Sequence, residues 1–221
     1  MRLFACLISL FSLPCLAENL SGTISISANY RYQGMNQFKG VSPQGNIAWR
    51  MTDNFVAGLW IGRYQFPPTE EETTEIDYML SYNHKFSFVD RIEISLWHYT
   101  FTDTELSDYD WSQLLVRYDR DERFTLTTGY SNDWLKRKRR TFFFEGTARH
   151  ATRNGTFGVT LGHNNLSDTR FLNSFNYLRL DYVFQHNNWA FSVEHTYQFV
   201  DDPVTRNWAE PGFGGSLTWT F

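Results

Sequence analysis

Apolar and polar residues alternate with a period of two from Leu20 onward, which predicts β-strands rather than helices. Each alternating segment is about ten residues long, the length with which a tilted strand crosses a bilayer. In the first segment, Gly22 to Gln33, the face expected to contact lipid carries Ile24, Ile26, Ala28, Tyr30 and Tyr32. We expect twelve strands, at residues 22–33, 44–51, 55–66, 75–85, 91–101, 110–119, 123–132, 141–150, 156–164, 174–185, 189–200 and 213–221.

The connections between these segments alternate in length. Residues 51–55, 119–123, 150–156 and 185–189 are short turns, and 85–91 is slightly longer. The expected long loops are 34–43, 67–74, 102–109, 133–140, 165–173 and 201–212. Short periplasmic turns opposite long outer loops are typical of outer-membrane barrels. The predicted fold class is therefore all-β, an antiparallel up-and-down transmembrane β-barrel of twelve strands that occupies residues 18–221.

A soluble β-sandwich would also alternate, but two features favour the barrel. The apolar face carries no Asp, Glu or Lys, as lipid contact requires, because a Lys or Arg at mid-bilayer costs about 2–4 kcal/mol. Arg63 is the nearest exception and lies at a strand end, where its side chain can reach the interface. Aromatic residues also gather near strand ends, as in interfacial girdles: Trp49, Tyr82, Tyr118, Tyr130, Tyr182, Phe184, Trp189, Tyr197 and Phe199.

Composition agrees with this picture. Aromatic residues make up 18% of the 221-residue chain, yet the mean hydropathy is only −0.45. A polar chain rich in aromatic residues suits a barrel with lipid outside and water inside. The formal charge of −4 suggests no nucleic-acid partner.

The N-terminus predicts a cleavable signal peptide over residues 1–17 and export to the outer membrane of a Gram-negative cell. Arg2 supplies the positive charge, Leu3 to Leu13 form the apolar core, and Cys15 to Ala17 supply small residues for cleavage. A lipoprotein acylated at Cys15 is the alternative, and Pro14 just before that cysteine disfavours it. Both cysteines fall in the leader, so we expect no disulfide in the mature chain.

The final strand alternates Leu217, Trp219 and Phe221 with small polar residues and ends on an aromatic side chain. It resembles the terminal signature that the barrel-insertion machinery of the outer membrane reads. We therefore expect that machinery, together with outer-membrane lipid and lipopolysaccharide, among the partners of the chain.

The polar face of each strand should line the lumen. Eight strands are filled by side chains and sixteen leave a wide channel, so twelve allow a narrow one. The charges of this face either pair and stiffen the barrel or form opposed walls that align a polar or zwitterionic solute. The charged residues expected there are Arg31, Arg50, Glu75, Asp77, Glu93, Arg117, Arg123, Glu145, Arg149, Arg179, Asp181 and Glu194.

Two charged clusters fall in the expected outer loops. Glu70, Glu71 and Glu72 are either solvated or a site for a divalent cation. The second cluster is either a solvated loop or a surface that contacts lipopolysaccharide phosphates or anionic solutes, and it consists of Lys136, Arg137, Lys138, Arg139 and Arg140.

Sequence motifs favour no enzyme. Neither G-x-S-x-G nor the His-x-Ser-Asn-Gly of outer-membrane phospholipases occurs, and no spacing of metal ligands appears. His163 with Ser167 and Asp168 would form a set at the outer rim, but such residues meet by chance in any loop. We expect no metal and no cofactor.

The segment from Asn29 to Gln37 resembles the opening of a proteobacterial family labelled Gcw_chp or TorF-family porin, and Gln33 replaces the second Arg of that pattern. Pro43-Gln44-Gly45 and Phe55 to Trp60 are similar to its next motifs. Shorter likenesses follow at 109–111, 129–131, 154–157 and 162–163. The resemblance implies an outer-membrane barrel with a transport role and supplies no binding residues.

These observations together predict an outer-membrane porin, a narrow channel for small polar solutes. The alternative is a closed barrel with a structural or surface-interaction role. An outer-membrane hydrolase is a third reading, and it requires a Ser-His or Asp-His pair on one wall.

Overall fold

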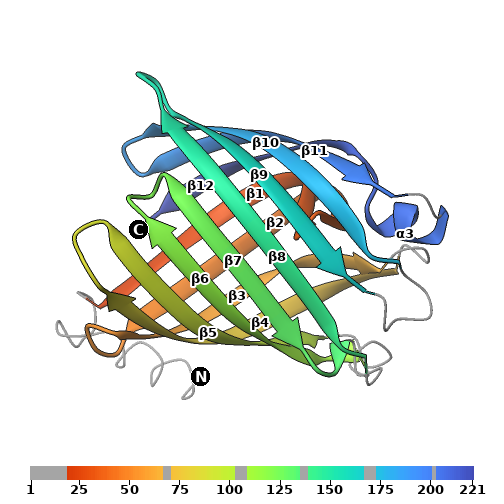
Figure 1. Cartoon of the computed structure of the whole chain (residues 1–221), viewed down its shortest axis with the longest axis horizontal. Coiled ribbons are helices and arrows are strands. Elements are labelled where there is room, and N and C mark those ends of the chain that lie inside the picture. Colours follow the sequence, from red (N-terminus) through yellow and green to blue (C-terminus); the bar gives the residue numbers. More distant parts are fainter. Residues whose placement is uncertain (1–18, 67–70, 103–108, 135–138, 167–172, 201–202) are drawn as a thin grey trace, which may run out of the picture.

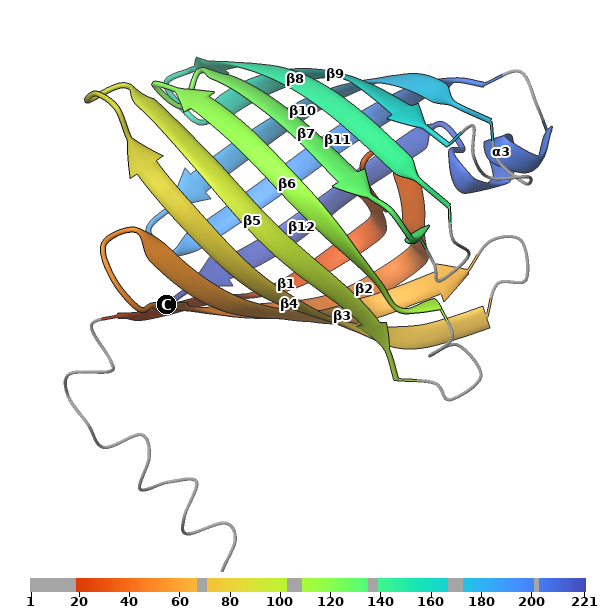
Figure 2. The ribbon, with the colours of Figure 1, turned by 60° about the horizontal axis from the view of Figure 1, so that its bottom comes forward.

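A computed structural model describes residues 19–66, 71–102, 109–134, 139–166, 173–200 and 203–221. Twelve antiparallel strands form one closed barrel in which each strand pairs with its neighbours in sequence and β1 pairs with β12 (Figures 1 and 2). The predicted fold class and strand number are confirmed. The strands are β1 (Leu20–Tyr32), β2 (Met35–Arg50), β3 (Phe55–Phe66), β4 (Glu71–Lys85), β5 (Asp90–Phe101), β6 (Trp111–Arg120), β7 (Phe124–Ser131), β8 (Thr141–Ala151), β9 (Thr156–Asn165), β10 (Phe175–His186), β11 (Trp189–Phe199) and β12 (Gly212–Thr220).

The two ends of the barrel differ in their connections, as predicted. One end carries five short turns, at residues 51–54, 86–89, 121–123, 152–155 and 187–188, and we call it the short-turn end. Thr23 of β1 pairs with Thr220 there, so the C-terminus lies at this end (Figure 1). The opposite, long-loop end carries the helix α3 (Pro203–Trp208), which interrupts the long loop expected at 201–212. No helix in the described ranges is long and apolar enough to cross a membrane. The leader predicted over 1–17 lies outside those ranges.

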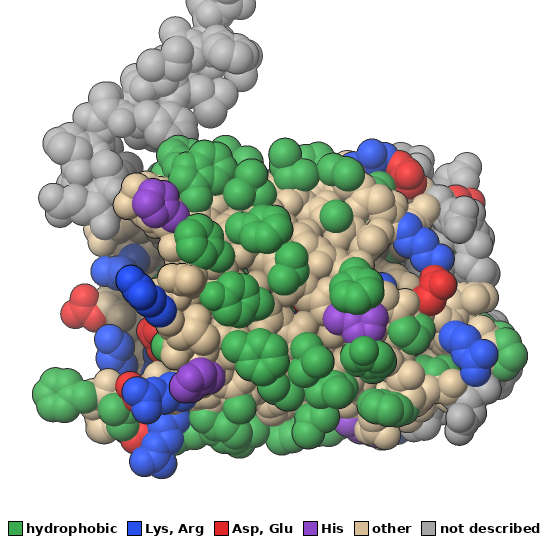
Figure 3. Space-filling model, turned by 90° about the horizontal axis from the view of Figure 1, so that it is seen from above, with side chains coloured by type: hydrophobic (Ala, Val, Ile, Leu, Met, Phe, Trp, Pro, Cys, Tyr) green, Lys and Arg blue, Asp and Glu red, His purple; other side chains and the backbone are tan. Residues whose placement is uncertain are grey.

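The outer wall of the barrel is apolar between its two ends. Figure 3 shows hydrophobic side chains spread over the wall and charged side chains at the two ends. Arg63 of β3 pairs with Glu72 of β4 near the long-loop end. Large apolar side chains that remain exposed on this wall include Ile24, Ile26, Ile47, Ile61, Leu80, Ile94, Leu96, Leu114, Phe142, Phe144, Phe157, Leu161, Phe191, Val193 and Leu217. An exposed apolar belt of this extent is what contact with lipid requires.

The first hairpin departs from the sequence prediction. No long loop spans 34–43, because β1 and β2 are joined by the two-residue turn Gln33–Gly34, whose φ angles are 51° and 74°. Two central residues with positive φ make the tight turns that join adjacent strands. The predicted lipid-facing positions of Tyr30 and Tyr32 are also wrong. A β-bulge at Asn29, with φ of 52°, shifts the register after Ala28 and turns both tyrosines into the barrel.

The end of this hairpin bends into the lumen (Figure 2). All residues from Gln33 to Phe38 are buried, and we call this segment the hairpin tip. Asn164 of β9 donates a hydrogen bond to the carbonyl of Gln33, and Gln198 Nε2 of β11 donates one to the carbonyl of Gly34 over 2.9 Å. Gln33 Nε2 donates to Gln113 Oε1 of β6 over 3.3 Å. The hairpin tip is therefore held from several walls of the barrel.

A compact apolar core lies beside the hairpin tip at the long-loop end. Strands β2, β3, β5 and β10, the loops after β7 and β9, and the residue after α3 contribute its buried side chains. These are Met35, Tyr64, Phe101, Trp134, Leu166, Phe175, Tyr177 and Ala209. Gly34 and Gly162 leave room for the ring of Tyr177, since a Cβ at either position would meet it. The core of the molecule thus fills one half of the barrel rather than its whole length.

Candidate functional site

The interior at the short-turn end is hollow. A chamber of about 420 Å³ opens there between strands β5 to β10, and we call it the charged chamber. Inward positions alternate along these strands with the lipid-facing ones, which is why charged residues spaced two apart reach the same space. Its lining consists of Arg91, Arg117, Asp119, Asp121, Glu122, Arg123, Arg149, Ala151, Thr156, Asp181, Val183 and Gln185.

Asp119 is the best-held charge of this chamber, with only 5% of its surface exposed. Its Oδ2 accepts a hydrogen bond from Arg117 Nη2 over 3.2 Å and another from Thr125 Oγ1 over 3.1 Å. Its Oδ1 accepts from the backbone N–H of Glu122 over 3.1 Å, and Arg91 Nη2 lies 4.0 Å from Oδ2. The carboxylate therefore fixes both the turn after β6 and the orientation of Arg117.

The remaining charges of the chamber are mixed in sign. Arg123 Nε lies 3.2 Å from Asp121 Oδ2, and Arg149 Nη1 donates to Thr125 Oγ1 over 3.3 Å. Four arginines and four carboxylates line this space, so it presents no field of a single sign. Such a surface suits solutes that carry both polar signs more than it suits a strong anion or cation.

A second group of charges lies midway along the barrel. Arg179 Nε is 3.9 Å from Asp181 Oδ1, and Arg179 Nη2 donates to Thr160 Oγ1 over 3.3 Å. The hydroxyl group of Tyr177 donates a hydrogen bond to Glu145 Oε1. This layer adjoins the charged chamber, which Asp181 lines, and the apolar core, which includes Tyr177.

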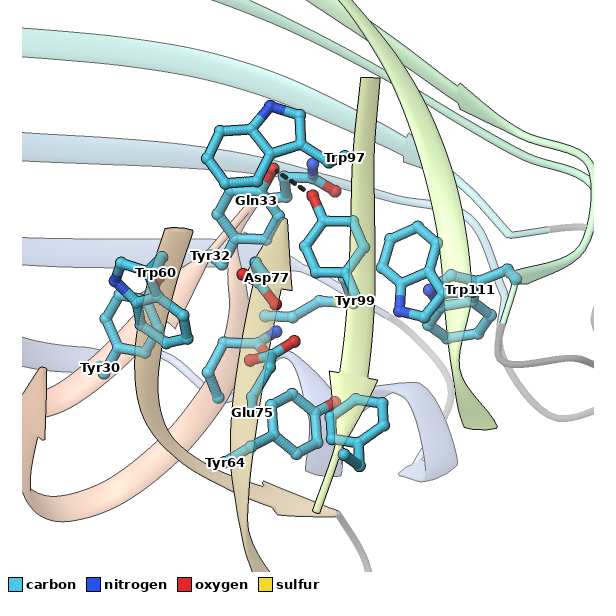
Figure 4. Close-up of a pocket in the computed structure, with 14 residues that line it drawn as sticks. Tyr30, Tyr32, Gln33, Trp60, Tyr64, Glu75, Asp77, Trp97, Tyr99 and Trp111 are labelled. Atoms are coloured by element: carbon cyan, nitrogen blue, oxygen red, sulfur yellow. Dashed lines mark hydrogen bonds between the residues drawn. The ribbon is translucent and has the colours of Figure 1, made fainter. Parts of the chain in front are cut away.

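The third interior space lies under the hairpin tip and is enclosed by aromatic rings (Figure 4). We call it the aromatic cavity; its volume is about 120 Å³. Two carboxylates, Glu75 and Asp77 of β4, project into it, and each is only 6% exposed. The other residues of its lining are Tyr30, Tyr32, Gln33, Met35, Gln37, Trp60, Tyr64, Trp97, Tyr99, Phe101, Trp111 and Trp134.

The charged residues expected on the inner face thus divide among several places. Arg117, Arg123, Arg149 and Asp181 meet in the charged chamber, and Glu93 is the cross-strand partner of Arg117. Glu145, Arg179 and Glu194 belong to the middle layer, where Glu194 pairs in register with Asp181. Glu75 and Asp77 lie apart from both, in the aromatic cavity.

Two of the expected residues lie near the barrel ends. Arg31 is at the base of the hairpin tip, where its Nη1 donates to the carbonyl of Gly212 over 2.7 Å and its Nε to Asn36 Oδ1 over 2.8 Å. Arg50 is exposed at the last position of β2. Neither contributes to the lining of the charged chamber.

Sequence reasoning missed the aromatic cavity. The predicted lumen lining contains only charged residues. The same predicted face also carries Trp60, Trp97, Tyr99 and Trp111. Their alternation with lipid-facing residues was a readable signal. The positions of Tyr30 and Tyr32 were not readable, because they depend on the bulge at Asn29.

The loop clusters are described in part. The backbone N–H of Trp134 donates to the carbonyl of Arg139 over 2.9 Å, whereas Lys136, Arg137 and Lys138 lie outside the described ranges. Glu70 lies outside them as well, and Glu72 pairs with Arg63. Among the described residues, no group of three His, Cys, Asp or Glu side chains is arranged to hold a metal ion.

Two histidines in the described part of the chain have a polar side chain beside the imidazole ring. His98 Nδ1 lies 2.9 Å from Ser112 Oγ, but this pair is exposed on the lipid-facing register. No described carboxylate is hydrogen-bonded to that ring, so the pair lacks the third member that orients a catalytic histidine. His163 Nδ1 lies 2.9 Å from Asn176 Oδ1, and its expected partners Ser167 and Asp168 lie outside the described ranges.

A closed barrel of twelve strands with a charged, partly hollow interior has the architecture of a porin. Solved structures agree: the KdgM porin superposes with a TM-score of 0.57 at 13% identity, over 91% of this chain and 98% of that one. The NanC porin gives a TM-score of 0.54 at 10% identity, over 91% and 98%. An outer-membrane channel from Pseudomonas putida F1 gives 0.53 at 10% identity, over 91% and 94%. These three are channels rather than enzymes, and at such identities the likeness concerns the fold. No protein-family model and no curated protein matches the chain.

Proposed function

We propose that this protein is an outer-membrane porin, a narrow channel for small polar solutes. The observation that carries the proposal is the charged chamber, a hollow of about 420 Å³ inside a barrel whose outer wall is apolar. A barrel needed only as a scaffold has no use for a solvated cavity lined by eight charged residues. Because four arginines and four carboxylates line the chamber, we assign the channel to uncharged polar and zwitterionic solutes.

The hairpin tip would set the width of this channel. It lies across the long-loop half and is held there by the side-chain donors Asn164 and Gln198. The tip also packs against the apolar core through Met35, and each of its hydrogen bonds contributes about 0.5–1.5 kcal/mol. The tip therefore acts as a constriction in the proposed channel, and we expect small, infrequent conductance steps from the unaltered protein.

Single-channel recording in planar bilayers tests this function. The double variant Asn164→Ala, Gln198→Ala removes both donors to the tip carbonyls and should increase the conductance or the open time several-fold. Ser192→Ala is the matched control, because it removes the 2.8 Å hydrogen bond to Ser216 on β11 and β12, remote from the tip. No conductance from either the unaltered protein or the double variant would refute the channel.

A closed barrel is the second candidate, and one observation favours it. The apolar core fills the long-loop half, where rings such as Phe175 and Tyr177 are only 1% exposed. If the hairpin tip never leaves this half, the barrel acts as a structural or surface-interaction protein. The double variant separates the two functions, since only a gated channel gains conductance when the tip is released.

Location and partners follow from the same proposal. We infer residence in the outer membrane of a Gram-negative cell, insertion through the strand that ends at Phe221, and contact of residues 136–140 with lipopolysaccharide. The resemblance to TorF-family porins, which is sharpest from Tyr30 to Trp60, implies an outer-membrane barrel and supports this location. Protease accessibility of the 133–140 loop on intact cells tests the orientation.

A further inference from the structure

The aromatic cavity has a composition that the proposed channel does not require. Glu75 and Asp77 occupy alternate positions of β4, so both side chains project to the same side of the sheet. Each is only 6% exposed. In the described part of the chain, no Lys, Arg or His forms an ion pair with either carboxylate. Two neighbouring buried carboxylates therefore lack a cation of the protein.

One oxygen of this pair has no partner of any kind. Asp77 Oδ1 is fully buried and accepts no hydrogen bond. A buried charge without a partner is costly, so such groups are normally paired or bind a ligand. Figure 4 shows Asp77 and Glu75 at the centre of the ring of aromatic side chains, with their oxygens directed into the cavity. The unsatisfied acceptor thus points at the space a ligand would fill.

Aromatic rings flank the carboxylates because of the strand register. Asp77 pairs across the sheet with Trp60 on β3 and with Tyr99 on β5. Directly opposite side chains lie about 4.5–5.5 Å apart at Cβ, so both rings stand beside the carboxylate. Trp60 stacks on Tyr30 with ring centroids 5.8 Å apart, and Tyr99 stacks on Trp111 at 4.2 Å. These pairs form two stiff walls on opposite sides of Asp77.

A backbone glycine completes the shape. Gly62 is the β3 partner of Glu75, and a Cβ at that position would fall on the six-membered ring of Trp60. The glycine therefore lets the indole fold beside Glu75. On the other side, Tyr32 Oη lies 3.2 Å from Tyr99 Oη, which donates to Gln113 Oε1 over 3.1 Å. These hydroxyls are satisfied by one another and by Gln113, which leaves for a ligand the carboxylates and the ring faces of Trp60 and Tyr99 that are turned away from Tyr30 and Trp111.

We propose that the aromatic cavity binds a small organic cation, an ammonium group with methyl or short alkyl substituents, between Trp60 and Tyr99 and against Asp77 and Glu75. Aromatic faces attract such cations, tryptophan most strongly, and the attraction grows when the site excludes water. A cavity of about 150 Å³ holds a benzene molecule in another protein, so about 120 Å³ accommodates an ammonium group of a few carbon atoms. A divalent metal ion would need six or more oxygen ligands, which two carboxylates among rings do not supply.

This inference goes beyond the proposed function: it assigns an organic cation to the aromatic cavity, whereas the uncharged polar and zwitterionic solutes of the channel are assigned from the charged chamber. The hairpin tip forms one wall of the cavity through Gln33, Met35 and Gln37. A cation bound there would contact the constriction itself. Binding and conduction can nevertheless be measured separately.

Choline chloride is the probe, titrated into the purified full-length mature barrel in lipid nanodiscs and followed by tryptophan fluorescence and calorimetry. Its uncharged carbon analogue, 3,3-dimethylbutan-1-ol, has the same shape without the charge. We expect saturable choline binding and at least tenfold weaker binding of the alcohol. Equal affinity for both compounds, or displacement of choline by equimolar sodium or calcium, would overturn the organic-cation site.

Asp77→Asn and Glu75→Gln keep the side-chain shape and should each weaken choline binding at least tenfold. Asp53→Asn removes the same charge from an exposed turn and should leave the affinity unchanged. Gly62→Ala retains both carboxylates but displaces the Trp60 indole, so it should also weaken binding, which covers the case that Asp77→Asn does not fold. Unaltered affinity in all three cavity variants would refute the site. Binding without conductance would refute the channel alone, and conductance without binding would refute the cation site alone.

Discussion

The two halves of the barrel interior share the same strands but follow different physical rules. In the long-loop half, rings and the hairpin tip pack tightly, and the carboxylates of Glu75 and Asp77 have no cation of the protein beside them. In the short-turn half, Arg117 pairs with Asp119 around a hollow chamber, and Arg123 pairs with Asp121. Packing in the first half should dominate the stability of the barrel, because dispersion and burial act over many atoms. Charges in the second half should affect ion passage more than stability, because water screens them.

The largest effect on stability is expected from the packed half. Phe175 is 1% exposed within the apolar core, and Phe175→Ala should lower the free energy of unfolding by about 3–5 kcal/mol, because it leaves a cavity. Phe157→Ala on the lipid-facing wall is the control, since its side chain is 41% exposed and already borders lipid. Denaturant unfolding in lipid vesicles, followed by tryptophan fluorescence, measures both. Equal losses would mean that the long-loop half is not a packed core.

A smaller loss should follow when the hairpin tip is displaced. Gly34 has φ of +74°, and its Cβ would lie 2.6 Å from Tyr177 Cδ1. Gly34→Ala therefore combines backbone strain of about 1–2 kcal/mol with overpacking of about 1–3 kcal/mol. Gly40→Ala separates the two causes, because Gly40 also has positive φ, +106°, but the nearest atom is 3.8 Å away. We expect Gly34→Ala alone to increase conductance in planar bilayers. A similar increase in conductance in both variants would mean that the hairpin tip is not the constriction.

The contrast between the halves also marks what sequence could predict. Period-two alternation depends only on neighbouring residues, so it predicts all twelve strands. It also predicts the short turn between β6 and β7 at residues 121–123. The long loop expected at 34–43 is wrong. Gly40, Ser42 and Pro43 have loop-like composition, yet they continue β2. Pro43 lies opposite Ile26 of β1, but the pairing of β2 with β3 begins only at Gln44, and a proline is tolerated where one edge of a strand is unpaired. The register shifts on either side of Tyr30 leave no signature in the alternation, and they decide which face Tyr30 and Tyr32 occupy.

The candidate sites were predictable to different degrees for the same reason. The inward direction of Glu75 and Asp77 follows from alternation along one strand. Their neighbours Trp60 and Tyr99 follow only from the register of β3 and β5 with β4. The contact of Gln33 with Gln113 joins residues 80 positions apart and requires the closed barrel. Interactions across a lumen depend on barrel shear, which no local pattern encodes.

Within the charged half, the buried member of the network should matter most. Asp119→Asn removes the charge that Arg117 and Arg91 share and should cost about 1–3 kcal/mol, because it weakens charged hydrogen bonds at a buried group. It also leaves the chamber with one more positive charge than negative. Reversal potentials in a salt gradient should therefore shift toward anion selectivity relative to the unaltered protein. An unchanged reversal potential would mean that ions do not pass through the charged chamber.

The smallest effect on stability is expected at the rim of the same chamber. Arg123 pairs with Asp121 at 3.2 Å, but the two side chains are 80% and 52% exposed. Exposed pairs contribute less than about 1 kcal/mol, because water and salt screen them. Arg123→Ala should thus barely change unfolding, while it shifts the reversal potential toward cations, opposite in sign to Asp119→Asn. Raising the salt from 0.1 M to 1 M should abolish most of that shift, since the screening length falls from about 10 Å to about 3 Å. A loss of stability as large as that of Phe175→Ala would mean that charge pairing, rather than packing, holds the barrel together at the short-turn end.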